Sequence, residues 1–282
     1  MTILVTGATG HVGRLVVNEL VEAGEQVRAL TRDPAKANFP AQVEVVRGDL
    51  TEPDSVPFDG VDRVYLFPVA ETAHEVVARA KDVRRFVVLS SGAVTFGMDT
   101  QFHLPVEQAV EASGAEWTHV RAGEFALNRL FMWGPSVRAD GTVWEPNPDA
   151  QSYPMHEADI AAVAVRALLD DGHAGQAYTL TGPQVLTTRE QVACVGQAIG
   201  RELRIRDVTT AEALEFYRRQ GGFAAQVAPF LLGEEGYEGG EAETVWDLTP
   251  SPDVERVLGR PGLSFARWAD DHRDDWAGQR PD

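Results

Sequence analysis

The sequence predicts an α/β fold, a doubly wound parallel sheet followed by a smaller C-terminal region. Short apolar runs suited to strands buried on both faces recur along the first half of the chain. Segments with the apolar period of a helix separate these runs, and turn residues close them. Strands that alternate with helices at this spacing are typical of a parallel sheet with helices on both faces.

The expected strands are short apolar runs that each end in turn residues. They lie at residues 3–5, 26–30, 43–46, 61–67, 85–90, 116–121 and 176–180. Helices are expected from residue 12 onward and at 72–82, 104–112 and 159–169. Thr-x-x-Glu pairs predict capping boxes at helix starts, and these pairs are Thr72 with Glu75, Thr187 with Glu190, and Thr209 with Glu212.

The alternating pattern loosens after Gly123. Loops around a pocket are expected at 131–134, at Trp144 and at the turn 146–148. The glycine-rich, aromatic segment 221–240 predicts a helix and a mobile loop that could act as a lid. We therefore expect one domain at 1–124, with a strand and a helix contributed from 150–182, and a second region at 125–282.

Composition argues against several classes of protein. A net charge of −18 argues against a nucleic-acid partner, because phosphate backbones need a basic surface. No apolar stretch reaches the roughly 18 residues of a membrane span, and we expect no signal peptide, because Met1-Thr-Ile leads straight into the first strand. The single cysteine, Cys194, allows no internal disulfide and fits a reducing cytoplasm. Only two basic residues are lysines, Lys36 and Lys81, which we interpret as the codon bias of a GC-rich bacterial genome.

Glycines follow the first strand in the spacing G-x-x-G-x-x-G, at Gly7, Gly10 and Gly13. A helix begins behind them, so its free amide groups and positive dipole end favour a phosphate in the turn. The first glycine permits a tight turn, the second lets a pyrophosphate approach, and the third lets helix and strand pack closely. A P-loop is excluded because Val12 stands where its second glycine belongs. The residues of the turn predicted to bind a dinucleotide are Gly7, Thr9, Gly10, His11, Val12 and Gly13.

Several motifs along the chain are shared with one known family. They are Thr6-Gly-Ala-Thr-Gly-His-Val-Gly13, Thr31-Arg32-Asp33-Pro34, Gly48-Asp-Leu50, Val88-Leu-Ser-Ser91 and His103-Leu-Pro-Val-Glu107, with a further match at 253–261. On these residues the chain resembles an atypical short-chain dehydrogenase/reductase of the NmrA-like group and its quinone-oxidoreductase branch. The resemblance spans nearly the whole chain. It implies a Rossmann domain that binds NAD(P)(H) and a smaller C-terminal substrate-binding region.

The chain departs from related extended reductases at their catalytic pair. Those enzymes carry Tyr-x-x-x-Lys, in which tyrosine donates a proton and lysine lowers its pKa. When Val106-Glu107 is aligned with the segment that follows this pair in the family, Asp99 falls at the tyrosine position and His103 at the lysine position. The quinone-reductase branch also has a histidine there, and Ser91 falls near the family's catalytic serine. Ser91 and His103 are the catalytic candidates, which polarise a carbonyl oxygen or relay a proton, or else only hold the nicotinamide ribose.

Residues after the second and third strands bear on the choice of cofactor. Arg32 could clamp the 2′-phosphate of NADP, or could be a solvated surface arginine. Asp33 could instead accept the 2′-OH of NAD, because it lies within the loose spacing expected of such an acid. We expect NADPH to be preferred, with NADH as the alternative. The family pattern places Asp49 and Leu50 beside the adenine, and Phe67 completes the predicted cofactor-binding set.

Aromatic residues of the second region are expected to line an apolar substrate pocket, although packing alone would explain each of them. These residues are Phe131, Met132, Trp133 and Trp144. We predict an NADPH-dependent reductase that transfers hydride to a ketone or quinone of a planar aromatic small molecule, such as a natural-product ketoreductase.

Two alternatives stay open at this point. The absent Tyr-x-x-x-Lys pair favours a non-catalytic redox sensor of the NmrA kind, which binds NADP and signals to a partner protein. An isomerase or dehydratase with a tightly held cofactor is the other. No metal is expected, because the histidines show no His-x-x-x-His spacing and no cysteine pair lies near them. The chain is expected to be a monomer or homodimer in the cytoplasm, without a membrane partner.

Overall fold

The computed structural model describes residues 1–234 and 249–277. The chain divides into two compact units with separate hydrophobic cores. Unit 1 consists of Met1–Ala122, Glu157–Leu180 and Pro252–Arg260, and unit 2 of Gly123–His156, Thr181–Ser251 and Pro261–Asp282. The expected lid segment continues beyond residue 234, where it lies outside the described residues. Among those described, no helix is both long and apolar enough to cross a membrane.

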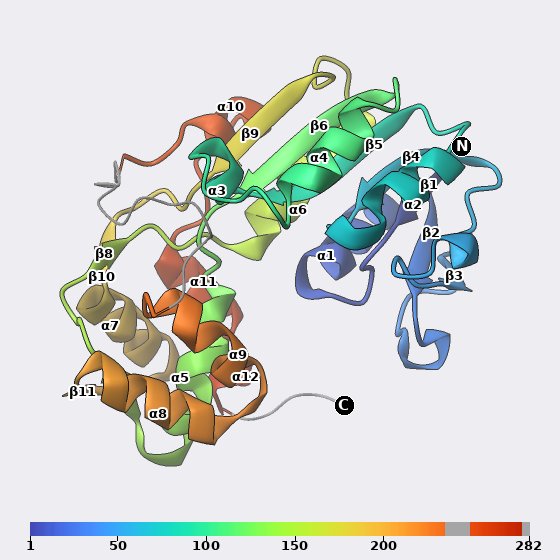
Figure 1. The fold of residues 1–282 in the computed structure, drawn as a ribbon. Coiled ribbons are helices and arrows are strands. Elements are labelled where there is room, and N and C mark those ends of the chain that lie inside the picture. Colours follow the sequence, from blue (N-terminus) through green and yellow to red (C-terminus); the bar gives the residue numbers. More distant parts are fainter. Residues whose placement is uncertain (235–248, 278–282) are drawn as a thin grey trace. The chain divides into compact units, whose positions relative to one another are not determined.

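Unit 1 is built on a seven-stranded sheet whose neighbouring strands are all parallel. In spatial order the strands are β3 (Glu44–Arg47), β2 (Gln26–Thr31), β1 (Thr2–Val5), β4 (Val61–Leu66), β5 (Arg85–Ser91), β6 (Glu116–Ala122) and β9 (Gln176–Leu180). The chain runs outward from β1 to β3, returns to the other side of β1, and runs outward again (Figure 1). The predicted doubly wound parallel sheet is confirmed, as are the positions of its strands.

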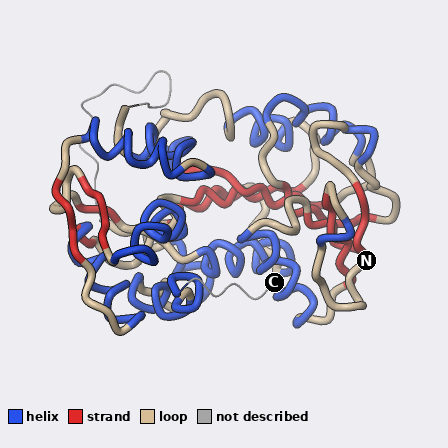
Figure 2. The backbone as a smooth tube through the Cα atoms, turned by 90° about the horizontal axis from the view of Figure 1, so that it is seen from below, coloured by secondary structure: helices blue, strands red, loops and turns tan. Residues whose placement is uncertain are grey.

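Helices cover both faces of this sheet, which explains why its strands are apolar on both sides (Figures 1 and 2). Helix α1 packs with α6, and α2 packs with α4. The helices of unit 1 are α1 (His11–Glu22), α2 (Ala73–Arg79), α3 (Gly92–Thr95), α4 (Leu104–Glu111), α6 (Glu157–Leu169) and α10 (Asp253–Leu258). Short 3₁₀ turns lie at Pro34–Lys36, Pro53–Ser55 and Ala70–Thr72.

The capping box predicted at Thr72 is wrong. Thr72 makes no side-chain capping hydrogen bond, and α2 ends at Arg79 rather than near residue 82. The Thr72 hydroxyl instead donates to the carbonyl oxygen of Leu50, 2.6 Å away. Thr72 is also the last residue of the 3₁₀ turn Ala70–Thr72. A partner from a distant loop has therefore replaced the local one. The capping boxes predicted in unit 2, which begin at Thr187 and Thr209, both form.

Unit 2 is mainly helical and contains two small sheets. Its helices are α5 (Leu127–Asp140), α7 (Thr188–Ile199), α8 (Thr210–Gln220), α9 (Gly222–Leu231), α11 (Phe265–Asp271) and α12 (Arg273–Ala277). Strands β7 (Thr142–Glu145) and β11 (Arg204–Asp207) pair in parallel, and β8 (Gln151–Ser152) and β10 (Leu186–Thr187) pair antiparallel. Fully buried Trp133, Trp268 and Trp276 lie in the core that joins these elements.

The loop predicted at 131–134 is wrong, because these residues lie inside α5. Leu130, Trp133 and Val137 are buried at helical spacing, which is the pattern of a helix packed against a core. The helix continues through Pro135 to Asp140. Trp144, also expected in a loop, lies in β7.

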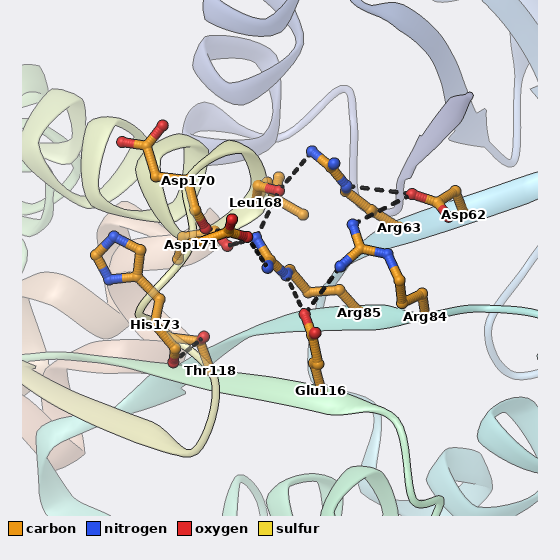
Figure 3. A network of polar contacts seen from close by, with 11 residues as sticks. Asp62, Arg63, Arg84, Arg85, Glu116, Thr118, Leu168, Asp170, Asp171 and His173 are labelled. Atoms are coloured by element: carbon orange, nitrogen blue, oxygen red, sulfur yellow. Dashed lines mark hydrogen bonds and ion pairs between the residues drawn. The ribbon is translucent and has the colours of Figure 1, made fainter.

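A network of polar contacts ties the amino ends of the central strands to the end of α6 (Figure 3). Arg85, at the start of β5, is buried, and its Nε donates to Oε2 of Glu116 at 2.7 Å. The same guanidinium donates to the carbonyl oxygens of Ala167, Leu168 and Asp170. The last carbonyls of a helix have no partner within it, so Arg85 satisfies groups that α6 cannot. This edge of the sheet therefore serves stability, and the functional candidates lie at the opposite edge.

Candidate active site

The predicted cofactor site lies at the carboxyl edge of the sheet in unit 1, where the strand order reverses. Strand β1 lies between β2, which follows it in the chain, and β4, which comes later. Such reversal points leave a crevice for ligands in open α/β sheets. Gly7 follows β1, Phe67 follows β4, and Ser91 ends β5, so these candidates share one edge.

The glycine turn is tightly wound and depends on residues without side chains. Gly7 has a φ of 59°, in the left-handed region that glycine adopts without strain. The amide of Gly10 donates to the carbonyl oxygen of Gly7 at 2.9 Å, and Gly10 then begins α1 with no side-chain cap. A Cβ on Gly13 would lie 2.2 Å from the same oxygen, which is an overlap. Helix α1 can therefore approach β1 this closely only with glycine at position 13.

Thr6 links the two strands at this edge, a role that the sequence analysis missed. Its hydroxyl donates to the carbonyl oxygen of Tyr65 at 3.0 Å and accepts from the amide of Phe67 at 2.7 Å. The contact holds Phe67 beside the glycine turn, because a Cβ on Gly7 would lie 3.1 Å from that of Phe67. Phe67 is 45% exposed, so part of its ring surface is accessible to a ligand. The only local signal for Thr6 was its place before the first glycine.

The cofactor-binding candidates differ in what they expose. Thr9, Gly10, His11, Arg32 and Phe67 are exposed in unit 1, and Gly7 and Asp49 are half-buried. Val12, Gly13 and Leu50 are buried in the packing of unit 1, so their side chains support the site from beneath. Hydrogen bonds from Thr51, first of all from its backbone amide, hold the pKa of Asp49 below its ordinary value. Asp49 is therefore ionised at neutral pH.

Positive charge gathers around the loop after β2. Arg32 is exposed there, and Asp33 forms an exposed ion pair with Lys36 at 3.2 Å. Arg14 of α1 donates to the carbonyl oxygen of Asn38 at 3.2 Å, and its guanidinium lies 5.3 Å from the ring centre of Phe39. Of these cations, only Arg32 is among the residues predicted to bind the cofactor. Asp33 is also exposed, and its carboxylate can accept a further hydrogen bond, so the alternative in which it accepts a ribose hydroxyl stays open.

The structure brings His103 together with Asp99, at the positions where tyrosine and lysine were missing. Oδ2 of Asp99 lies 2.5 Å from Nδ1 of His103. Oδ1 of Asp99 accepts the backbone amides of Gln101, Phe102 and His103 at 3.3, 2.9 and 3.2 Å. Burial alone would raise the pKa of Asp99, but its hydrogen bonds to His103 and to the backbone amides outweigh burial and hold that pKa below its ordinary value.

Ser91 is held separately. Its hydroxyl accepts the amide of Ala93 at 3.2 Å and caps the short helix α3. In the part of the chain that the structure describes, Ser91 and His103 are not hydrogen-bonded to each other. Each could contact a bound molecule independently, and the catalytic role of both stays a prediction.

Glu107 anchors helix α4, whose first turn follows His103. Its carboxylate accepts a short hydrogen bond from Ser90 at the end of β5, and two from Arg121 of β6 at 3.0 and 2.7 Å. Burial would raise the pKa of Glu107, but these hydrogen bonds hold it below its ordinary value. Glu107, Glu111 and His119 are grouped closely enough to hold a metal ion, but Arg121 already neutralises Glu107. We interpret the group as structural.

The predicted substrate-binding residues lie in unit 2. Met132 and Trp133 are buried in its core, so packing accounts for both. Phe131 is half-buried, and its ring centre lies 4.8 Å from that of Phe223. Trp144 stacks on Phe216, with 4.5 Å between ring centres, and the guanidinium of Arg206 lies 4.1 Å from the centre of its ring. A substrate contact by any of these residues stays a prediction.

Comparison with known proteins bears directly on the glycine turn. A family model described as NAD(P)H-binding matches residues 7–171, more than half of the chain, beginning at Gly7. The chain belongs to this NAD(P)H-binding family. The resemblance to NmrA-like atypical short-chain reductases is thereby confirmed, and NAD(P)H is the cofactor. The exposed turn, the missing side chain at Gly10 and the cations near Arg32 fit such a dinucleotide.

Two curated relatives that align over nearly the whole chain are reductases. The (4-alkanoyl-5-oxo-2,5-dihydrofuran-3-yl)methyl phosphate reductase of Streptomyces griseus is 35% identical, covering 98% of this chain and 99% of its own length. The NAD(P)H azoreductase of Xenophilus azovorans is 33% identical, covering 96% of this chain and 97% of its own.

Solved structures show the same fold. Triphenylmethane reductase of Citrobacter sp., crystallised with NADP(H), superposes with a TM-score of 0.77 at 22% identity, over 97% of this chain and all of that chain. The quinone oxidoreductase QOR2 of Escherichia coli, crystallised with NADPH, gives 0.74 at 22% identity, over 96% of this chain and 99% of that chain. At these identities the likeness concerns the fold.

Replacing Arg32 with alanine should remove most of the expected preference for NADPH over NADH. A charged hydrogen bond of about 1.5–3 kcal/mol corresponds to roughly ten- to hundredfold in affinity. NADH, which lacks the 2′-phosphate, should bind both forms almost equally. Calorimetric titration with each cofactor measures this, with Arg166→Ala, an exposed arginine on α6, as the control. Equal affinity of the wild type for the two cofactors would contradict the assignment of Arg32.

Proposed function

We propose that this chain, an NAD(P)H-dependent oxidoreductase, uses NADPH to reduce a quinone or ketone of a planar aromatic small molecule. The observation that carries the proposal is the Asp99–His103 pair, which stands in place of tyrosine and lysine in the connection that follows β5. The relatives support it, since their names describe reductases of azo compounds, of an oxo-dihydrofuran and, in the superposed structures, of quinones and triphenylmethanes.

The chemistry of the missing tyrosine favours a quinone over an isolated ketone. Bound NADPH supplies a hydride from nicotinamide C4. A reduced ketone bears an alkoxide, whose conjugate acid is about as weak as water, with a pKa of roughly 15.7. A reduced quinone bears a phenolate, whose pKa is about 10, as in tyrosine. The difference of about 6 units makes the phenolate easier to generate by about 8 kcal/mol. A site with histidine as its proton carrier is suited to the second acceptor.

The residues of unit 1 would have separate roles in cofactor binding and in catalysis. The glycine turn would bind the pyrophosphate through the amides of α1, and Arg32 would neutralise the 2′-phosphate. Ser91 would donate a hydrogen bond to the oxygen that gains charge, and His103 would supply a proton. Glu107 would hold α4 against β5 and β6, so that His103 keeps its place.

The test compares two bicyclic aromatic acceptors, naphthoquinone and tetralone, by the consumption of NADPH. We expect steady turnover of naphthoquinone and much slower turnover of tetralone. A reaction without protein, and one with a Gly10→Val variant, control for direct reduction of the quinone. If neither acceptor nor a wider panel is reduced while NADPH still binds, the reductase proposal fails. A partner protein that binds only one redox form of the cofactor would then establish the sensor alternative.

Ser91→Ala and His103→Ala should each lower kcat on the accepted substrate by about 10²-fold or less, the range for positioned proton donors. Ser91→Ala should leave NADPH affinity nearly unchanged, while His103→Ala should weaken it if the ring also holds the ribose. Steady-state kinetics together with NADPH titration separate these effects. Unchanged kcat in both variants would remove Ser91 and His103 from the catalytic set.

A further inference from the structure

The two carboxylate oxygens of Asp99 serve different partners. Oδ1 accepts backbone amides and shapes the turn at 101–103, whereas Oδ2 faces only the ring of His103. Asp99 itself is 1% exposed, so no water competes for these contacts. The turn needs Oδ1 alone, and the contact through Oδ2 is therefore additional to it.

This contact decides which nitrogen of His103 carries hydrogen. Asp99 is ionised, because its hydrogen bonds hold its pKa below the ordinary value, and a carboxylate can only accept. Nδ1 of His103 must therefore donate. In the neutral ring Nε2 is then the bare acceptor, and in the protonated ring Nε2 carries a second hydrogen. No described residue is hydrogen-bonded to Nε2, and 25% of the side chain is exposed.

We propose that Asp99 is a positioning residue that makes His103 the proton carrier of this site. The proposal rests on the quinone-reductase function proposed above. Reduction of a quinone to its hydroquinone requires two electrons and two hydrogens. Hydride supplies both electrons and one hydrogen, so that NADPH is oxidised to NADP⁺ while the quinone is reduced.

The second hydrogen comes from protonated His103. Its Nε2–H bond breaks, an O–H bond forms on the reduced quinone, and the ring is left neutral. Asp99 stays ionised throughout and keeps Nδ1–H in place, so the proton lost is always the one on Nε2. The exposed part of the ring lets solvent restore that proton before the next turnover.

The pair also explains how the site works without its tyrosine. Asp99 occupies the tyrosine position but has no proton to give, and its carboxylate is turned into the protein. In this chain the proton donor is therefore His103, four residues after the position of the tyrosine. Without the contact to Asp99, His103 could adopt either tautomer.

Asp99→Asn separates this role from a merely structural one. The amide oxygen of asparagine can replace Oδ1 and keep the turn, whereas its NH₂ group replaces Oδ2. That group can only donate, so Nδ1 of His103 would become the acceptor and the hydrogen would move to Nε2. The variant therefore preserves the loop and reverses the tautomer.

Nitrogen NMR of the histidine rings in the full chain reports the tautomer without substrate. The chain has seven histidines, and the His103 signal is the one missing from His103→Gln. In the neutral form we expect Nδ1–H in the wild type and Nε2–H in Asp99→Asn. With naphthoquinone, kcat should fall by about 10²-fold or less in Asp99→Asn, while NADPH affinity stays unchanged. Asp140→Asn, which alters a similar turn contact to Thr142 in unit 2, should change neither readout.

The outcomes are distinguishable. A wild type that reduces no quinone defeats the proposed function, whereas the tautomer still shows whether Asp99 orients His103. Nε2–H in the wild type overturns the proposal, and this measurement requires no folded Asp99 variant. Equal kcat in the wild type and Asp99→Asn, in an enzyme that does reduce naphthoquinone, overturns it as well.

Discussion

Replacing Gly10 with valine should abolish the binding of NADPH and NADH while unit 1 stays folded. The backbone at Gly10 is extended, with φ −76° and ψ 171°, a conformation that any residue adopts. A Cβ there would lie 3.2 Å from the carbonyl oxygen of Gly7, which is tight but not an overlap. Valine would fill the space through which a pyrophosphate approaches the amides of α1. Calorimetry should show at least a hundredfold loss of affinity, about 2.7 kcal/mol, with an unchanged far-UV spectrum.

Gly13→Ala is the matched variant, in the same turn but with a different cause of failure. Its Cβ would lie 2.2 Å from the carbonyl oxygen and 2.9 Å from the carbonyl carbon of Gly7. Backbone atoms cannot move aside as a flexible side chain can, so α1 would be pushed from β1 and the protein destabilised. Normal NADPH binding by Gly10→Val would show that the cofactor lies elsewhere. Normal stability of Gly13→Ala would show that the close approach is not required.

Arg85→Met should lower the free energy of unfolding by about 3 kcal/mol, because each buried carbonyl oxygen that loses its donor costs about 1–3 kcal/mol. The side chain of Arg85 is 3% exposed, and it hydrogen-bonds three carbonyl oxygens at the end of α6. Methionine would fill part of the volume but donate nothing, which leaves those carbonyls without this partner. Urea unfolding measures the loss, and hydrogen exchange of Glu157–Leu169 should accelerate.

Arg84→Met is the control, because the neighbouring arginine contacts the same carboxylate from the surface. Its Nη1 lies 3.0 Å from Oε2 of Glu116, but its side chain is 40% exposed. Surface ion pairs contribute about 0–1 kcal/mol, so the loss should be small. NADPH affinity should be retained in both variants, since the network lies at the opposite edge of the sheet from the glycine turn. Equal destabilisation by the two variants would contradict the role assigned to Arg85.

Features that depend on short-range patterns could be predicted from the sequence. The strands of unit 1 are apolar on both faces, and each lies where its run of residues placed it. The capping boxes at Thr187 and Thr209 formed because both partners lie three residues apart on one chain segment. The helix at Thr72 shows the limit of this reasoning. The hydroxyl of Thr72 donates to the carbonyl oxygen of Leu50, which lies 22 residues away in the sequence, and no local pattern shows such a contact.

The loop predicted at 131–134 failed for a related physical reason. A glycine and a proline in succession, such as Gly134 and Pro135, usually interrupt a helix. In unit 2 the core that contains Trp133, Trp268 and Trp276 stabilises α5, so the helix continues past the glycine and the proline. Burial of large aromatic side chains, worth several kcal/mol, exceeds the cost of a weak helix former.

The sequence by itself determined the cofactor class and the fold of unit 1. Phosphate binding at a helix start needs backbone amides and missing side chains, and residue types at fixed offsets specify both. It also placed Asp99 and His103 at the positions of the absent catalytic pair. Only the tertiary structure decided that Asp99 is buried, ionised and bonded to Nδ1 of His103, and that Arg85 reaches carbonyls 82–85 residues away. Burial and hydrogen-bond partners come from neighbours that the fold assembles, and they control how a side chain holds its protons.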